Sequence, residues 1–245
     1  MNALELNNVC YSYHELSGET YALLDVNMQV EKGSFVSIVG PSGCGKSTLL
    51  SIIAGLISPE KGTITINGNI GYMLQHDQLF EWRTVYRNVT LGLDIHKEKN
   101  QEAYDYVKRL LNQYGLSDFS DKRPSQLSGG MRQRAALIRT LALKPDILLL
   151  DEPFSALDYQ TRLTVCDDIA SIIKKEKKTA IMVTHDLAEA ISVGESVYVM
   201  SKRPGRIEKV IPITFQNDTE SPMNRRNEPE FNEYFNQLWR EMEDR

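Results

Sequence analysis

Apolar positions follow more than one spacing along the chain. Residues 3–13 alternate between apolar and polar, and residues 22–30 alternate again after a turn at residues 17–19. This period of two is typical of half-buried strands and predicts an antiparallel pair. Continuous apolar runs, which are typical of buried parallel strands, occur at residues 34–39, 147–150, 179–183 and 197–200.

Between these strands, apolar residues recur at every third or fourth position, which predicts helices. The expected helices are residues 48–54, 103–114, 130–142 and 162–175. Residues 63–66 alternate like a strand, Asn67 and Gly68 form a strong turn signal, and residues 70–74 return as a strand. This arrangement predicts a β-hairpin. Strands that alternate with helices predict a doubly wound parallel sheet.

Length allows one large α/β domain, and we expect a single domain over residues 1–245. Its N-terminal antiparallel strands form a β subdomain, and residues from about 76 to 142 form an inserted α-helical subdomain. Residues 216–230 are polar and contain proline, so we expect a linker or a loosely packed loop. An amphipathic helix follows at about residues 230–243, and its acidic polar face favours docking on the domain over binding to a membrane surface.

Composition excludes several classes of function. The net charge is −5 and no basic tract occurs, which argues against binding to nucleic acid. Cys10, Cys44 and Cys166 are widely spaced, which predicts neither a disulfide framework nor a metal site and fits a reducing compartment. No apolar run approaches the roughly 20 residues of a membrane span, and no signal peptide is recognised. Any membrane role would therefore come through a partner.

One loop organises the rest of the chain. A glycine, four residues and then Gly-Lys-Ser match the phosphate-binding loop pattern. The loop consists of Gly40, Pro41, Ser42, Gly43, Cys44, Gly45, Lys46, Ser47 and Thr48. An ordinary glycine-rich turn is the alternative, but the flanking strand and helix favour a P-loop NTPase core, where backbone N–H groups and the helix N-terminus hold phosphates. Lys46 would neutralise the β- and γ-phosphates, and Ser47 would offer its hydroxyl to Mg²⁺.

A second nucleotide motif is the apolar strand that ends in Asp151 and Glu152. An aspartate at this strand end can hold Mg²⁺ through water. Glu152 would then lie near the γ-phosphate, where a carboxylate can accept a proton from an attacking water. A surface acidic pair is the alternative, and the phosphate loop argues against it.

A third motif places a serine and glycines at a helix start, which is again an anion site. It consists of Leu127, Ser128, Gly129, Gly130, Met131, Arg132 and Gln133. A chain that binds one nucleotide does not need two separate sites for its γ-phosphate. We therefore expect this motif to close over the nucleotide of a second, identical chain.

With these motifs the chain resembles the ATP-binding cassette, the nucleotide-hydrolysing subunit of ABC transporters. The resemblance implies ATP and Mg²⁺, with Gln75 sensing Mg²⁺ and the attacking water, and His185 contacting the γ-phosphate. It also implies that Tyr13 stacks on adenine. The loop that would cross the dimer axis is Ser155, Ala156, Leu157 and Asp158. Taken alone, Tyr13, Gln75 and His185 would more often be a strand residue, a solvated loop residue and a satisfied polar residue.

Further segments resemble bacterial importers of nitrate, sulfonate and taurine, a group that also imports thiamine-pyrimidine precursors. These segments are residues 82–85, 184–190, 203–207 and the aromatic C-terminal helix. The resemblance implies a homodimer at the cytoplasmic face of the cell membrane, bound peripherally to permease subunits and served indirectly by an extracellular substrate-binding protein. The segment between Ile66 and Gln75 is shorter than in this group, which leaves the substrate open.

Two other functions remain open from the sequence. A soluble cassette acting on ribosomes or DNA usually has two cassettes or a coiled-coil insertion, and an export ATPase fits the small size and the Arg-Pro-Gly-Arg stretch less well. Leu79, Phe80 and Trp82 follow Gln75 closely. Apolar residues in such a loop predict either core packing or a contact with a permease.

Overall fold

The computed structural model describes residues 1–15, 18–97, 100–216 and 221–243. Its strands form a sheet with the order β2-β1-β4 and a larger sheet with the order β5-β6-β7-β3-β8-β9. Their bounds are β1 Asn2–Glu15, β2 Gly18–Glu31, β3 Phe35–Val39, β4 Lys61–Ile66, β5 Ile70–Met73, β6 Ile147–Asp151, β7 Thr179–Val183, β8 Ser196–Met200 and β9 Ile207–Pro212. Of the turn predicted at residues 17–19, Ser17 lies outside the described residues, whereas Gly18 and Glu19 begin β2.

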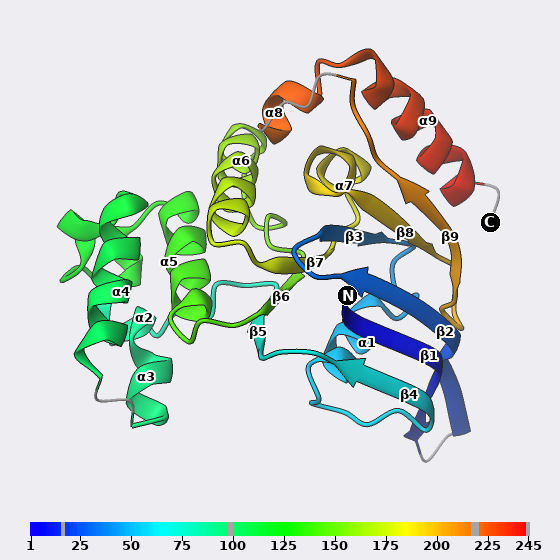
Figure 1. Ribbon diagram of the computed structural model, residues 1–245, viewed down its shortest axis with the longest axis horizontal. Coiled ribbons are helices and arrows are strands. Elements are labelled where there is room, and N and C mark those ends of the chain that lie inside the picture. The colour runs from blue at the N-terminus through cyan, green and yellow to red at the C-terminus, as the bar shows by residue number, and fades with distance from the viewer. Residues whose placement is uncertain (16–17, 98–99, 217–220, 244–245) are drawn as a thin grey trace.

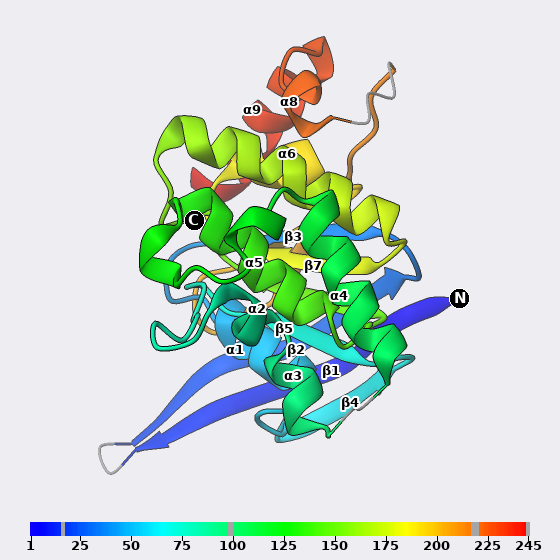
Figure 2. The same cartoon turned by 90° about the vertical axis from the view of Figure 1, so that its left-hand side faces the viewer.

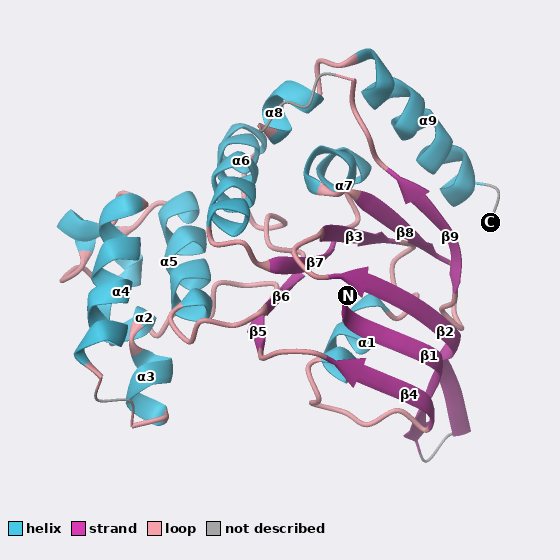
Figure 3. Ribbon diagram, viewed as in Figure 1, coloured by secondary structure: helices cyan, strands magenta, loops and turns pink. Residues whose placement is uncertain are grey.

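Helices cover both faces of the larger sheet (Figures 1 and 3). The α-helices are α1 Lys46–Ile53, α2 Val85–Val89, α3 Leu91–Ile95, α4 Gln101–Gln113, α5 Gly129–Leu141, α6 Tyr159–Lys175, α7 Leu187–Val193, α8 Pro222–Arg225 and α9 Pro229–Glu243. Short 3-10 turns lie at Ser117–Phe119 and Pro124–Gln126. Figure 2 shows α2 to α6 together on one side of the molecule. None of the described helices is long and apolar enough to span a bilayer.

The larger sheet is parallel from β5 to β8, and β9 is its antiparallel edge. Side chains of β6 point alternately into different cores. Leu148 and Leu150 pack with residues of α5 and α6, whereas Ile147 and Leu149 pack with α1 and the smaller sheet. A strand buried on both faces is why its sequence is continuously apolar. The expected α/β class with a parallel sheet and an N-terminal antiparallel sheet is confirmed.

The predicted hairpin at residues 63–74 is wrong. β4 pairs with β1 in the smaller sheet, whereas β5 pairs with β6 in the larger one. Asn67 N donates to Ala3 O at 2.8 Å, and Asn69 N donates to Asp146 Oδ2 at 2.9 Å. The chain therefore crosses from one sheet to the other at the position where the local Asn-Gly signal predicts a reversal.

Residues 221–230 are also more ordered than the sequence predicts, while residues 217–220 lie outside the described part. The short helix α8 is held by Asp167 Oδ1, which accepts from Ser221 Oγ at 2.7 Å and from Met223 N at 3.1 Å. Arg225 donates to the carbonyl of Ser192 at 3.1 Å. The loose linker predicted here is therefore wrong for these residues, because polar side chains dock them on α6 and α7.

Candidate functional site

The phosphate loop joins the end of β3 to α1. Gly45 has φ 108°, and a Cβ there would lie 2.8 Å from Leu23 Cδ2, so only glycine fits against β2. The Lys46 side chain is buried and folds back over its own loop. Its Nζ donates to Gly40 O at 2.8 Å and to Pro41 O at 3.0 Å. The ammonium is thus held by loop carbonyls at the mouth of a helix N-terminus, the place where phosphate charge is favoured.

Asp151 lies at the carboxyl end of β6, beside this loop. Its Oδ1 accepts from Ser47 Oγ at 3.2 Å, and its Oδ2 accepts from Tyr72 OH at 3.1 Å. Burial raises the pKa of Asp151 above its ordinary value, because a desolvated carboxylate is disfavoured. A hydroxyl beside a carboxylate offers the hard oxygen ligands that Mg²⁺ prefers. Tyr72 was not predicted, because strand alternation alone does not reveal which residue reaches Asp151.

Glu152 contacts two other residues that the sequence predicts to act in catalysis, Gln75 and His185. Gln75 Nε2 donates to Glu152 Oε2 at 3.1 Å, and His185 Nδ1 lies 3.3 Å from the same oxygen. These residues follow β5, β6 and β7, which are neighbours in the parallel sheet. The carboxyl ends of adjacent parallel strands meet at one edge, so residues far apart in the sequence converge. Glu152 has φ 45°, a backbone strain of a kind that clusters at functional sites.

Tyr13 lies on β1 beside the phosphate loop. Its OH is 3.0 Å from Thr48 Oγ1, and its ring packs edge-on against Tyr11 with centroids 5.1 Å apart. Tyr13 as a whole residue is 40% exposed. A half-exposed aromatic face next to a phosphate loop can stack on a planar base.

The serine-glycine motif lies away from the loop of its own chain. α5 and α1 lie on opposite sides of β6 and β7 (Figure 1), and within the described chain no hydrogen bond joins residues 127–133 to residues 40–48. Ser128 caps α5 by accepting from Met131 N at 3.3 Å. Ser128 and Gly129 are exposed, so their polar groups can face another molecule.

The other motif residues point into the chain. Leu127 and Met131 pack against the core around α5, and Gly130 and Gln133 are buried. Arg132 Nε lies 2.7 Å from Asp77 Oδ2, which ties α5 to the segment after Gln75. Asp77 was not singled out from the sequence, because its partner is 55 residues away. Direct contact with an outside nucleotide is therefore open mainly to Ser128 and Gly129.

Residues 155–158 connect the acidic end of β6 to α6. Ser155 Oγ donates to Glu152 O at 3.0 Å. Asp158 caps α6 by accepting from Thr161 N at 3.1 Å. Leu157 is buried, and a Cβ on Gly129 would lie 2.9 Å from Leu157 Cδ2. This loop therefore touches both Glu152 and the start of α5.

Arg203 and Gly205 contact the backbone of the phosphate loop. Arg203 Nε donates to Gly43 O at 3.1 Å, and Gly205 N donates to Ala22 O at 2.9 Å. A Cβ on Gly205 would lie 2.2 Å from Cys44 O. The sequence marked this stretch only through a resemblance, and its structural role needed the three-dimensional packing.

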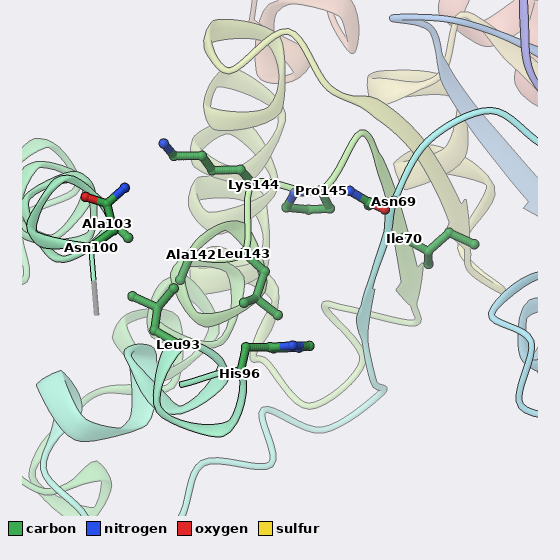
Figure 4. Close-up of a pocket in the computed structure, with 10 residues that line it drawn as sticks. All are labelled: Asn69, Ile70, Leu93, His96, Asn100, Ala103, Ala142, Leu143, Lys144 and Pro145. Carbon is green, nitrogen blue, oxygen red and sulfur yellow. The ribbon is translucent and has the colours of Figure 1, made fainter. Parts of the chain in front are cut away.

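A cavity of about 510 Å³ lies elsewhere, at the amino ends of β5 and β6 (Figure 4). Two of its polar side chains already have partners, since Asn100 caps α4 and Lys144 Nζ lies 3.4 Å from Glu102 Oε1. No catalytic group that the sequence predicts lines it. The lining residues are Asn69, Ile70, Leu93, His96, Asn100, Ala103, Ala142, Leu143, Lys144 and Pro145. We therefore place the functional site at the opposite, carboxyl ends of the strands.

The family model described as "ABC transporter" matches residues 23–155, more than half of the chain. The chain belongs to the ABC transporter family. Relatives of this ABC protein cover almost its whole length. The ABC transporter ATP-binding protein YtlC of Bacillus subtilis is 45% identical and covers 99% of this chain and 96% of the relative. The nitrate import ATP-binding protein NrtD of Synechocystis is 40% identical over 96% of this chain and 93% of the relative.

Another relative and a solved structure are also ATP-binding proteins of this family. The taurine import ATP-binding protein TauB of Pelagibacter ubique is 43% identical over 88% of this chain and 84% of the relative. A dimeric ATP-binding cassette in a post-hydrolysis state with ADP and Pi has a TM-score of 0.73 and 33% identity, covering 86% of this chain and 99% of that one. The protein is therefore an ABC ATPase that binds and hydrolyses ATP.

Proposed function

We propose that this ABC ATPase works as a homodimer that drives an import permease. The observation that carries the catalytic part is the Glu152 carboxylate, held by Gln75 and His185 and placed next to the Ser47–Asp151 pair. A water beside the γ-phosphate would need a proton acceptor within hydrogen-bond reach. Glu152 supplies it, and Gln75 and His185 orient it.

Phosphate binding falls to the loop of residues 40–48. Lys46 exchanges its bonds to loop carbonyls for contacts with the β- and γ-phosphates, and Tyr13 stacks on the adenine. Ser47 and Asp151 are the residues that would hold Mg²⁺, with Gln75 close by. When bound, Mg²⁺ neutralises charge on the phosphate oxygens. His185 is 56% exposed, so its imidazole is open to a γ-phosphate.

A second copy of the chain would complete each site. Ser128 and Gly129 are exposed at the N-terminus of α5, and within the described residues no hydrogen bond joins them to the phosphate loop of their own chain. In a two-fold symmetric dimer, this helix end of one chain would face the phosphate loop of the other. The dimeric state of the related cassette with ADP and Pi supports this arrangement.

The permease contact would form around Trp82. Trp82 is 71% exposed and packs against Phe80, with ring centroids 4.7 Å apart. An exposed indole without a core role is a typical interface anchor. For Leu79 the sequence left core packing and a permease contact both open, and its burial in the core under the helices favours core packing. Arg139 binds the carbonyls of Asp77 and Gln78, so the contact would be linked to α5.

Membrane attachment would be peripheral, on the cytoplasmic side, through the permease alone. The names of NrtD and TauB as nitrate and taurine import proteins support an oxyanion or sulfonate substrate, with thiamine-pyrimidine precursors as the further class. The cassette does not touch the substrate in this proposal. Selection belongs to the permease and an extracellular binding protein.

The test is purification of the tagged protein from detergent-solubilised membranes, followed by reconstitution of the complex into vesicles. We expect integral membrane subunits to co-purify and ATP to drive nitrate or taurine from the opposite side of the membrane into the compartment that contains the ATPase. Trp82→Ser should lose the membrane subunits but keep ATP hydrolysis in solution. Export, or co-purification with ribosomes alone, would contradict the proposal.

A further inference from the structure

Arg162 lies between two loops that belong to different parts of the site. It is in the first turn of α6, directly after residues 155–158. Its guanidinium extends towards the turn that carries His185 and begins α7. No role follows for it from the motifs in the sequence, because its partners are up to 27 residues away along the chain.

The guanidinium is hydrogen-bonded on one side and ion-paired on the other. Its NH2 group donates to Leu157 O at 3.1 Å. NH1 lies 3.6 Å from Asp186 Oδ2, and Nε lies 3.8 Å from Glu189 Oε1. Within the part of the chain that the structure describes, Nε has no hydrogen-bond partner. The hydrogen bond to Leu157 O is therefore the shortest of these contacts. The two longer ion pairs to Asp186 and Glu189 leave room for the guanidinium to move.

Glu189 and Asp186 in turn fix the backbone around His185. Glu189 is 3% exposed, and its Oε2 accepts from Thr184 Oγ1 at 2.6 Å. Asp186 caps α7 through Ala188 N at 2.8 Å, and its own N–H donates to Thr184 Oγ1 at 3.0 Å. Thr184 and Asp186, on either side of His185, thus belong to one hydrogen-bonded network with Glu189. Arg162 supplies the positive charge that faces the two carboxylates of this network.

The same network reaches the helix end that would face a partner chain. Leu157, whose carbonyl Arg162 binds, packs directly against Gly129 at the start of α5. A continuous path therefore runs from Gly129 through Leu157 and Arg162 to the turn at His185. Such a path can couple two sites only if it contains a group that can adopt more than one arrangement. The Arg162 guanidinium is such a group, because its ion pairs to Asp186 and Glu189 are long.

We propose that Arg162 is a positioning residue that sets the orientation of His185 according to the state of the 155–158 loop. Docking of a partner chain on this loop would move Leu157 and shift the fork of Arg162 against Asp186 and Glu189. The imidazole then reaches the γ-phosphate only when the second chain is in place. The inference rests on the proposed roles of His185 and the dimer. Arginine suits this task because its planar fork can serve several acceptors at fixed angles, whereas lysine serves them as a point charge.

The test is steady-state ATP hydrolysis and ATP binding by Arg162→Gln and Arg162→Lys. We expect kcat to fall about 10- to 100-fold, the size of effect that misplacement by about an ångström can produce. ATP affinity should stay near wild type, because the phosphate loop and Tyr13 are untouched. Arg162→Lys should lie between the wild type and Arg162→Gln. Unchanged kcat in Arg162→Gln would overturn the inference.

A matched control is Arg134→Gln on α5. Arg134 is also partly buried, pairs with Asp168 at 3.8 Å and donates to Tyr114 O at 3.2 Å. Its Nε likewise has no hydrogen bond among the described residues. Neither Asp168 nor Tyr114 belongs to the site, so loss of Arg134 should affect thermal stability but not kcat. An equal fall in kcat for both variants would mean that Arg162 acts only through stability.

A double variant separates structure from positioning. Glu189→Gln removes the buried charge that Arg162→Gln leaves without its cation, so the double variant should regain thermal stability. It should not regain kcat, because the fork is still absent. Recovery of both would overturn the inference. If Glu152→Gln proves fully active in the same assay, the proposed catalytic function has failed instead, which is a different result.

Discussion

Replacing Glu152 with glutamine removes a proton acceptor and keeps nearly the same shape. In the wild type, Oε2 accepts from Gln75 at 3.1 Å and lies 3.3 Å from His185 Nδ1. A glutamine oxygen can keep a hydrogen bond to Gln75, so the change converts a charged acceptor into a neutral one and costs about 1 kcal/mol of stability. The left-handed backbone is common to both side chains and adds nothing to the difference.

The effect on catalysis should be much larger than the effect on folding. Loss of a general base lowers the rate by about 100- to 10,000-fold, equivalent to about 3–5 kcal/mol in the activation free energy. The variant should therefore fold, bind ATP near normally and release almost no phosphate. Since ATP is no longer consumed, an ATP-bound dimer should persist in gel filtration.

Phosphate release and binding of a fluorescent ATP analogue measure these effects separately. Glu5→Gln is the matched control, because Glu5 is a partly exposed carboxylate on β1 that accepts a hydrogen bond from Asn7 Nδ2 at 3.3 Å. We expect its kcat to equal that of the wild type. A Glu152→Gln variant with a kcat close to that of the wild type would refute the assignment of Glu152 as the base.

Three further predictions concern other residues. Lys46→Ala should weaken ATP binding and lower hydrolysis about 100- to 1,000-fold, because removal of a preorganised charged donor has this cost; normal turnover would contradict the phosphate-loop assignment. Trp82→Ser should change the stability by less than about 0.5 kcal/mol, whereas Leu79→Ser should cost about 2–5 kcal/mol, and thermal melting distinguishes them. Burial raises the pKa of Glu189 above its ordinary 4.5, so stability that depends on this carboxyl is present below pH 4.5 and is lost as pH rises through the folded-state pKa. The stability of the wild type relative to Glu189→Gln should therefore fall above about pH 4.5, by at most about 1.4 kcal/mol per pH unit, and a flat difference would contradict the burial argument.

Strands and helices with strong local periods could be predicted from the sequence. The apolar run at residues 147–150 and the helical spacing at residues 103–114 correspond to β6 and α4, because burial on both faces or on one stripe leaves a direct trace in the sequence. The hairpin at residues 63–74 failed for the opposite reason. Asn67 and Gly68 form a local turn signal, whereas the pairing of Ile70 with Ile147 depends on residues far away.

The functional residues divide in a similar way. Lys46 and Asp151 belong to motifs that are contiguous in the sequence, so their roles at phosphate and Mg²⁺ could be predicted from the motifs. Tyr72 and Arg162 could not be predicted, because their partners come from other elements and no spacing identifies them. α8 also lacked a signal, since the side chain that holds it, Asp167, is 54 residues from Ser221.

The central claim is that two chains together form each ATP site. It is tested most directly by mixing two inactive variants, Lys46→Ala and Ser128→Arg, and measuring phosphate release. In a mixed dimer one site carries both changes and the other carries neither. With random pairing, half of the dimers are mixed, so roughly a quarter of wild-type activity should return. No recovery, while native mass spectrometry shows mixed dimers, would contradict the account.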